Sequence, residues 1–271
     1  MPKSKVAYQC QECGTTVFQW SGQCACCRAW NTLIETVEEL PQTQNLESIG
    51  YAGTMPECSR LSQVKPEKMV RFSSGYAELD RVLGGGLVPG SIILLGGAPG
   101  TGKSTLLLQV TTQLSKISNC LYVTGEESLE QIAIRANRIA LDTNHLDCVS
   151  ETRIEAIAHL VKQVKPVLLV VDSVQAMQVE ALNGAPGSLG QVRESAALLT
   201  RLAKLSNVTV LLVGHITKEG ALAGPKVLEH IIDVSLLFEG ENGTRFRILR
   251  AHKNRFGSIG ELGIFAMTAK G

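Results

Sequence analysis

The sequence predicts an α/β fold in which a mostly parallel sheet is covered by helices on both faces. Two continuous apolar runs, residues 167–171 and 208–213, are expected to form buried strands, and segments with helical spacing alternate with them. Strands of a parallel sheet that is covered on both faces are apolar throughout, which is the pattern found here. A glycine-rich loop near residue 100, set between an apolar run and a helical segment, is typical of the same architecture.

The bulk composition limits the classes of protein that this chain can be. Its 271 residues suffice for one large α/β domain and a small additional module. A formal net charge of +1 excludes a general basic field, so any nucleic acid must bind to a local patch. No apolar run is long enough to span a membrane, and the N-terminus has no secretory signal. We therefore expect a cytoplasmic protein with reduced cysteines and no membrane partner.

Two Cys-x-x-Cys pairs stand at the start of the chain. They are formed by Cys10, Cys13, Cys24 and Cys27. Two such pairs that face each other make a tetrahedral cage of four thiolates, which suits Zn²⁺. A disulfide or a redox motif is disfavoured in a reducing compartment, whereas an iron site of the rubredoxin type fits the same ligands, and Cys26 can compete as a ligand. We predict a four-cysteine zinc ribbon over residues 1–34.

The segment that follows the cysteines contains little material for a core. Residues 35–68 include Pro41, Pro56 and Pro66 among many Gln, Glu and Ser residues. This composition is typical of a linker. We therefore expect the large domain to occupy residues 69–271.

The glycine-rich loop is the most informative segment of the large domain. Residues 97–104 fit G-x-x-x-x-G-K-[ST], directly after the apolar run 91–95 and before the helical segment 105–110. The backbone N–H groups of such a loop bind phosphate, together with the N-terminus of the next helix, so a plain glycine-rich turn is disfavoured. Lys103 is expected to reach the β- and γ-phosphates of a nucleoside triphosphate, and Ser104 to hold Mg²⁺. The predicted nucleotide-binding residues are Gly97, Ala98, Pro99, Gly100, Thr101, Gly102, Lys103, Ser104 and Thr105.

Strands and helices continue to alternate after this loop. A short strand is expected at residues 120–123, and helices are expected over 129–141, 153–165 and 188–206. From about residue 231 the apolar segments become shorter and glycines recur. This change predicts antiparallel hairpins at one edge of the sheet.

Acidic residues stand at the ends of two predicted strands. Asp172 follows the run 167–171 and is expected to hold Mg²⁺ together with Ser104, although an aspartate that caps a helix would occupy the same position. Glu126 and Glu127 follow the strand 120–123 and therefore fall in the ligand crevice of such a sheet. Either glutamate can polarise an attacking water or cap the next helix, and their position does not distinguish them.

A basic stretch lies near the end of the chain. No acidic residue occurs between positions 245 and 258, where five basic residues stand: Arg245, Arg247, Arg250, Lys253 and Arg255. A solvated charged strand explains residues 245–248, in which basic and apolar residues alternate. The run 251–258 instead places two cations, an asparagine and a phenylalanine in a predicted turn. Such a turn can meet the phosphates of DNA or the γ-phosphate held by a neighbouring subunit.

Together these segments resemble the bacterial RadA (Sms) family, whose core is a RecA-like P-loop ATPase. The resemblance rests on the cysteine pairs with Trp30-Asn31-Thr32 and on the segments 78–87, 125–128, 214–220 and 253–257. It covers nearly the whole chain and implies a hexameric DNA-dependent ATPase that acts on single-stranded and branched DNA. Family members drive branch migration in recombinational repair and assist the RecA recombinase, with ATP, Mg²⁺ and Zn²⁺ as cofactors. They usually continue into a Lon-protease-like domain, which the 271 residues do not include.

The resemblance also implies roles for single residues. It makes Glu126 the catalytic glutamate and His215 the sensor of the γ-phosphate. It makes Lys253 and Arg255 cations that complete the site of the next subunit, so that the expected catalytic set is Lys103, Glu126, Lys253 and Arg255. It places a first DNA-binding loop before Gln191 and Arg193, and a second over residues 217–225 with Lys218 and Gly220.

Two other functions fit part of the pattern. A signalling ATPase of the KaiC kind shares the paired glutamates but acts on protein. A non-catalytic adaptor for RecA, switched by nucleotide and carrying the zinc module, also fits. Stimulation of ATP turnover by single-stranded DNA distinguishes the expected motor from both.

Overall fold

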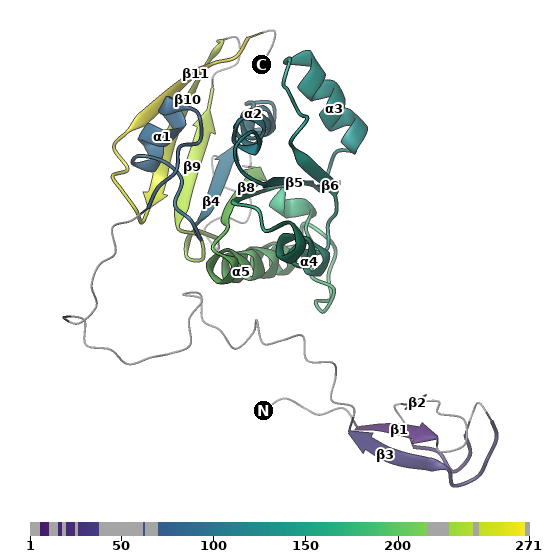
Figure 1. Ribbon diagram of the computed structural model, residues 1–271. Coiled ribbons are helices and arrows are strands. Elements are labelled where there is room, and N and C mark those ends of the chain that lie inside the picture. Colours follow the sequence, from purple (N-terminus) through teal and green to yellow (C-terminus); the bar gives the residue numbers. More distant parts are fainter. Residues whose placement is uncertain are drawn as a thin grey trace. The chain divides into compact units, whose positions relative to one another are not determined.

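The computed structural model describes residues 6–10, 16–17, 20–24, 27–37, 62, 70–215, 228–240 and 244–268. The chain divides into two compact units, residues 1–46 and 47–271 (Figure 1). Among the described residues, no helix has the length and apolar character that crossing a membrane requires.

The first unit contains a small antiparallel sheet. Its strands are β1 (Val6–Cys10), β2 (Thr16–Val17) and β3 (Leu33–Val37), in the order β2-β1-β3. β3 pairs with the whole of β1, from Cys10 opposite Leu33 to Val6 opposite Val37. The module therefore extends beyond the expected boundary at residue 34, because residues 35–37 have backbone partners on β1 and are not part of a linker.

The second unit is built on an eight-stranded sheet in the order β11-β10-β9-β4-β8-β7-β5-β6. The parallel strands are β4 (Ile92–Gly97), β5 (Cys120–Thr124), β6 (Asp147–Ser150), β7 (Leu168–Asp172), β8 (Thr209–His215) and β9 (Val234–Glu239). Two antiparallel strands, β10 (Phe246–Asn254) and β11 (Leu262–Ala266), complete one edge. The predicted fold class is confirmed.

One detail of the predicted sheet was wrong. The whole region after residue 231 was expected to form antiparallel hairpins, but β9 runs parallel to β4, with Val234 opposite Ile93. β9 is mostly buried and lies next to the central strand, so it belongs to the parallel core. Only β10 and β11 have the expected orientation.

Helices cover both faces of the sheet (Figure 1). One apolar cluster joins the first face to α1 (Ala77–Leu83), α2 (Lys103–Ser115) and α3 (Leu129–Arg138). A second cluster joins the other face to α4 (Ile154–Val164) and α5 (Leu189–Ser206). The three predicted helices after the phosphate loop are therefore confirmed as α3, α4 and α5.

The parallel strands all end at the same edge of the sheet. β4, β5, β7 and β8 deliver Gly97, Thr124, Asp172 and His215 to that edge. In open parallel sheets, ligands bind outside the carboxyl ends of the strands. Ser128 begins α3 with a reciprocal capping box to Gln131, which anchors the turn that carries Glu126 and Glu127.

Candidate functional site

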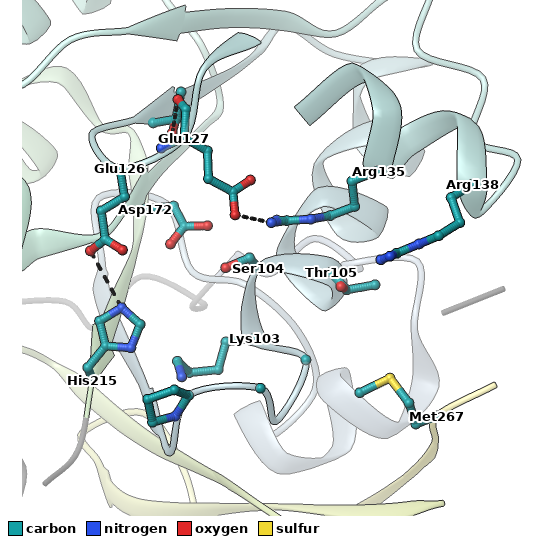
Figure 2. A pocket seen from close by; sticks show the side chains of 14 residues that line it. Lys103, Ser104, Thr105, Glu126, Glu127, Arg135, Arg138, Asp172, His215 and Met267 are labelled. Atoms are coloured by element: carbon teal, nitrogen blue, oxygen red, sulfur yellow. Dashed lines mark hydrogen bonds and ion pairs between the residues drawn. The ribbon is translucent and has the colours of Figure 1, made fainter. Parts of the chain in front are cut away.

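A cavity of about 380 Å³ lies at this edge of the large sheet (Figure 2). The phosphate loop and the start of α2 form one wall, and α3 forms the opposite wall. The residues that line it are Pro99, Gly100, Gly102, Lys103, Ser104, Thr105, Thr124, Glu126, Glu127, Arg135, Arg138, Asp172, His215 and Met267. The volume falls in the range of small-molecule sites, which is about 300–1,000 Å³.

The phosphate loop is tightly constrained by its surroundings. A Cβ at Gly97 would lie 2.5 Å from the carbonyl oxygen of Phe238, and one at Gly102 would lie 2.6 Å from Met267 Cε. Gly102 also has a φ of +100°, a conformation that glycine adopts without strain. Glycine is therefore required at both positions.

Lys103 is nearly buried at the floor of the cavity. Its Nζ donates to the carbonyl oxygens of Gly97 at 2.7 Å and Ala98 at 2.9 Å. Burial lowers the pKa of Lys103, and the negative charges of Asp172 and Glu126 oppose this shift. The ammonium is thus held beside the loop where phosphates are expected.

Asp172 and Ser104 line the same cavity and offer oxygen ligands. Asp172 Oδ2 accepts a hydrogen bond of 2.6 Å from the hydroxyl of Tyr122. Burial, reinforced by the charge of Asp172, raises the pKa of Tyr122 well above 10, so this hydroxyl remains a donor. A carboxylate and a hydroxyl are hard oxygen donors, and this pair fits Mg²⁺ bound together with phosphate.

The structure distinguishes the two adjacent glutamates. Glu126 accepts a hydrogen bond from Ser173 Oγ, and its Oε1 lies 3.5 Å from His215 Nε2. Glu127 forms an ion pair with Arg135 of α3 (Figure 2). The carboxylate of Glu127 is therefore engaged by a cation, whereas that of Glu126 is 48% exposed beside His215. This difference favours Glu126 as the group that polarises a water.

Arg135, Arg138 and Met267 were not predicted from the sequence as residues of the site. Arg135 and Arg138 are three positions apart on α3, and residues with this spacing lie on one face of a helix. Because α3 starts just after the two glutamates, that spacing was a usable signal. Met267 follows β11 and reaches the cavity only through the tertiary fold.

Gln191 does not have the role expected for it. It is 2% exposed, and its side chain accepts from the Val179 N–H at 2.7 Å and donates to the Leu182 carbonyl at 2.8 Å. Further contacts at 3.3 Å join it to the carbonyls of Val179 and Gly184. Burial excludes direct contact between this side chain and DNA in this conformation, because the amide is used to hold the loop before α5.

The other predicted DNA-binding residues lie in different settings. Arg193, two residues further along α5, is exposed. Lys218 and Gly220, like the rest of the predicted second loop at 217–225, lie outside the described residues. The structure therefore describes Arg193 alone among the basic residues assigned to DNA.

Lys253 and Arg255 lie near the amino ends of the parallel strands, whereas the cavity of their own chain lies at the carboxyl ends. Arg255 Nη1 is 3.2 Å from Asp233 Oδ1, and the Asp233 N–H donates to the carbonyl of Ile92 at the start of β4. The five residue steps from Ile92 to Gly97 in β4 span roughly 17 Å at about 3.3 Å per residue. Arg255 is therefore too far away to contact phosphates on the loop of the same chain.

Lys253 is held by backbone groups. Its Nζ donates to the carbonyl of Ile232 at 2.7 Å and to that of Glu229. Burial lowers its pKa, and the nearby charge of Arg255 acts in the same direction. The ammonium of Lys253 thus anchors the segment before β9, while Arg255 has a side chain that is 53% exposed.

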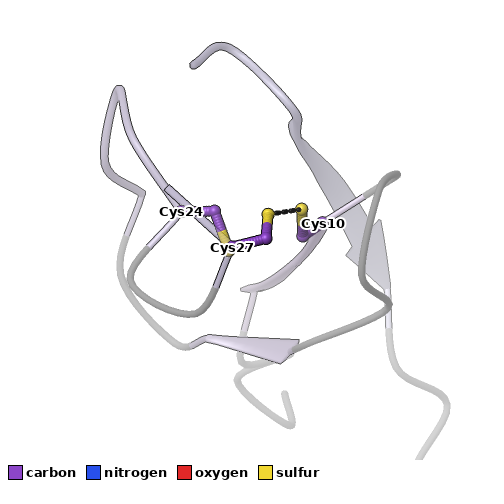
Figure 3. Close-up of side chains that lie close together, drawn as sticks. All are labelled: Cys10, Cys24 and Cys27. Carbon is purple, nitrogen blue, oxygen red and sulfur yellow. Dashed lines mark hydrogen bonds between the residues drawn. The ribbon is translucent and has the colours of Figure 1, made fainter. Parts of the chain in front are cut away.

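Three cysteine sulfurs converge in the first unit (Figure 3). The Sγ atoms of Cys10, Cys24 and Cys27 lie within 4.8 Å of one another, and Thr32 Oγ1 is 3.2 Å from Cys10 Sγ. The predicted fourth ligand, Cys13, lies outside the described residues, as does Cys26. Converging thiols are the donor set that Zn²⁺ prefers, so the described residues fit the expected metal.

The fold and the cavity define a RecA-like ATPase core preceded by a zinc ribbon. Residues 58–221 match the AAA domain family, and residues 8–35 match the Rubredoxin metal binding domain family. Since the first match covers more than half of the chain, the chain belongs to the AAA domain family.

Individual proteins agree with this assignment. The chain is 54% identical to the DNA repair protein RadA of Haemophilus influenzae and 52% identical to that of Escherichia coli K12, over 98% of this chain and 59% of each relative. The resemblance to RadA is therefore confirmed, and the chain spans about three fifths of the length of these relatives. A KaiC-like protein from Pyrococcus horikoshii OT3 has the same fold, with a TM-score of 0.62 and 20% identity, over 75% of this chain and 98% of that protein.

Proposed function

We propose that this chain hydrolyses ATP in the cavity between the phosphate loop and α3, and that single-stranded DNA stimulates the reaction. One observation supports this above all others. Lys103, Glu126, Asp172 and His215 come from four separate segments, yet all of them line one cavity at the carboxyl edge of the sheet. These are the residue types that phosphoryl transfer needs: a phosphate-binding cation, a metal ligand, a base and a sensor.

Each residue has a role that its position explains. Lys103 and the N–H groups of the loop bind the β- and γ-phosphates. Mg²⁺ held by Ser104 and Asp172 would supply positive charge to the phosphate oxygens. Glu126 orients and polarises the attacking water, and Ser173 fixes its carboxylate. His215, beside Glu126, responds to the γ-phosphate.

DNA is proposed to bind next to the cavity. The segment that leads to Arg193 begins after β7, and the predicted loop with Lys218 and Gly220 begins after β8. β7 and β8 are paired neighbours, so both segments start at the cavity edge. His215 is the last residue of β8, and a shift of the following loop on DNA is expected to move its imidazole relative to Glu126.

Assembly into a ring is proposed because Arg255 cannot serve its own cavity. Its exposed guanidinium, near the amino ends of the parallel strands, is suited to bind the γ-phosphate held by a neighbouring subunit. The relatives are DNA repair proteins. From the family resemblance we further propose a hexamer that acts on branched DNA and drives branch migration with RecA in recombinational repair. Zn²⁺ at Cys10, Cys13, Cys24 and Cys27 would hold the first unit folded.

Steady-state ATP turnover with and without single-stranded DNA tests the proposal. We expect DNA to raise turnover by the natural chain, and Lys103→Ala to abolish it, because the phosphates lose the loop's cation. Lys116→Ala, which changes an exposed lysine at the far end of the same helix, is the matched control. Turnover that ignores DNA would favour a KaiC-like role, and nucleotide binding without turnover would favour an adaptor.

A further inference from the structure

Tyr122 carries a hydroxyl group in a part of the core that is otherwise apolar. It lies in the middle of β5 with 0% of its surface exposed, and its ring belongs to the same apolar cluster as Leu107 and Val170. A phenylalanine would fill this space equally well. Because a buried hydroxyl is costly unless it forms a hydrogen bond, the one partner that this hydroxyl has among the described residues is informative. That partner is Asp172 Oδ2, at 2.6 Å.

The contact is built into the register of the sheet. Tyr122 pairs with Val170, and Thr124 pairs with Asp172. Side chains at diagonal positions of neighbouring strands share one face and are within reach of a long side chain. The hydroxyl therefore meets Asp172 through paired strands, which are more rigid than a loop.

This hydrogen bond restrains one oxygen of Asp172 and leaves the other available. In the described part of the chain, Tyr122 is the one hydrogen-bond donor recorded for this carboxylate. Lys103 lines the same cavity as Asp172, and the charge of Asp172 opposes the lowering of the pKa of Lys103, so a carboxylate released from Tyr122 has a nearby cation toward which it can turn.

We propose that Tyr122 is a positioning residue for the magnesium site: it holds Asp172 so that Oδ1 faces the cavity beside Ser104, away from Lys103. This inference rests on the proposed function, in which Asp172 holds Mg²⁺. Tyr122 touches neither nucleotide nor metal and acts only through the orientation of the carboxylate.

Tyr122→Phe removes the hydroxyl and keeps the ring. The first readout is the affinity for a fluorescent ATP analogue, measured over a series of Mg²⁺ concentrations and in EDTA. We expect the Mg²⁺ concentration at half-saturation to rise about tenfold, the scale of a lost hydrogen bond to a charged group. Affinity in EDTA is expected to remain unchanged, and saturating Mg²⁺ is expected to restore most of the turnover.

Thr111→Val is the matched control. It also removes a buried hydroxyl from the same face of the core, but among the described residues the Thr111 hydroxyl bonds only to the carbonyl of Leu107 in its own helix. Its Mg²⁺ dependence is expected to equal that of the natural chain. A second control is a double-mutant cycle, because Tyr122→Phe should have no further effect on Mg²⁺ dependence in an Asp172→Asn background.

Two results would overturn the inference. One is a half-saturating Mg²⁺ concentration within about twofold of the natural value in a folded variant, since this is less than a hydrogen bond to a charge contributes. The other is an equal loss of affinity with and without Mg²⁺, which would show a packing defect. Failure of the natural chain to bind nucleotide would instead contradict the proposed function.

Discussion

Replacing Glu126 with glutamine removes one negative charge and little else. The amide oxygen can still accept the hydrogen bond from Ser173, so the side chain should keep its place. ATP affinity is therefore expected to stay within about threefold of the natural value, because the phosphate contacts are untouched. Only polarisation of the attacking water is lost.

The expected loss of rate follows from that role. General-base assistance contributes about 10²–10⁴-fold, so kcat should fall by this factor, equivalent to roughly 3–5 kcal/mol of transition-state stabilisation. Single-turnover hydrolysis with DNA present measures the chemical step, and binding of a fluorescent nucleotide measures affinity. Thermal unfolding provides the control for folding.

Glu127→Gln is the matched comparison. Its amide oxygen can still accept from Arg135, but the ion pair, whose side chains are 33% and 17% exposed, loses its charge. We expect about 1 kcal/mol less stability and less than a tenfold change in kcat. A fully inactive Glu127→Gln beside an active Glu126→Gln would refute the assignment of the base. Small effects of both would show that neither carboxylate activates the water.

Other predictions concern parts of the chain outside the reaction centre. Gln191→Ala should lower the free energy of unfolding by about 2–3 kcal/mol in denaturant titrations, because it strands the buried backbone groups that the amide now satisfies. Arg193→Ala on the same helix should leave stability unchanged and weaken binding of single-stranded DNA; the reverse pattern would contradict both roles. Cys10→Ser should release zinc in metal analysis and unfold the first unit, while the melting temperature of the second stays constant, and iron in the natural chain would count against the site. Burial raises the pKa of Cys120 to about 12 and that of Cys148 to about 11, so both thiols should resist iodoacetamide at pH 8 in the folded protein.

Local signals were sufficient for most of the fold. The runs 167–171 and 208–213 and the loop 97–104 each carry their pattern within a few residues, and the structure has β7, β8 and the phosphate loop there. The direction of β9 was missed because a short apolar strand has the same composition whichever way it runs. Its direction depends on pairing with β4, which is distant in the sequence.

In the candidate site, too, local sequence signals identified some residues, whereas contacts with other elements decided the roles of others. Lys103 and Ser104 were assigned from the motif of the glycine-rich loop, and Asp172 from its place at the end of a strand; all three line the cavity. Strand position alone could not distinguish Glu126 from Glu127, because the difference depends on Arg135 from the following helix; only the family resemblance had singled out Glu126. The burial of Gln191 was missed for a related reason. Its hydrogen-bond partners are backbone groups of the loop before α5, and the amino-acid composition does not show how that loop folds.

The measurement that tests the shared active site most directly mixes two inactive variants. Lys103→Ala lacks the phosphate-binding cation, and Arg255→Ala lacks the cation proposed to act on the neighbour. In an equimolar mixture, random pairing gives roughly a quarter of the interfaces an intact loop beside an intact Arg255. We predict that DNA-stimulated ATP turnover returns to about that fraction, whereas no recovery in rings shown to contain both variants would contradict a site shared between subunits.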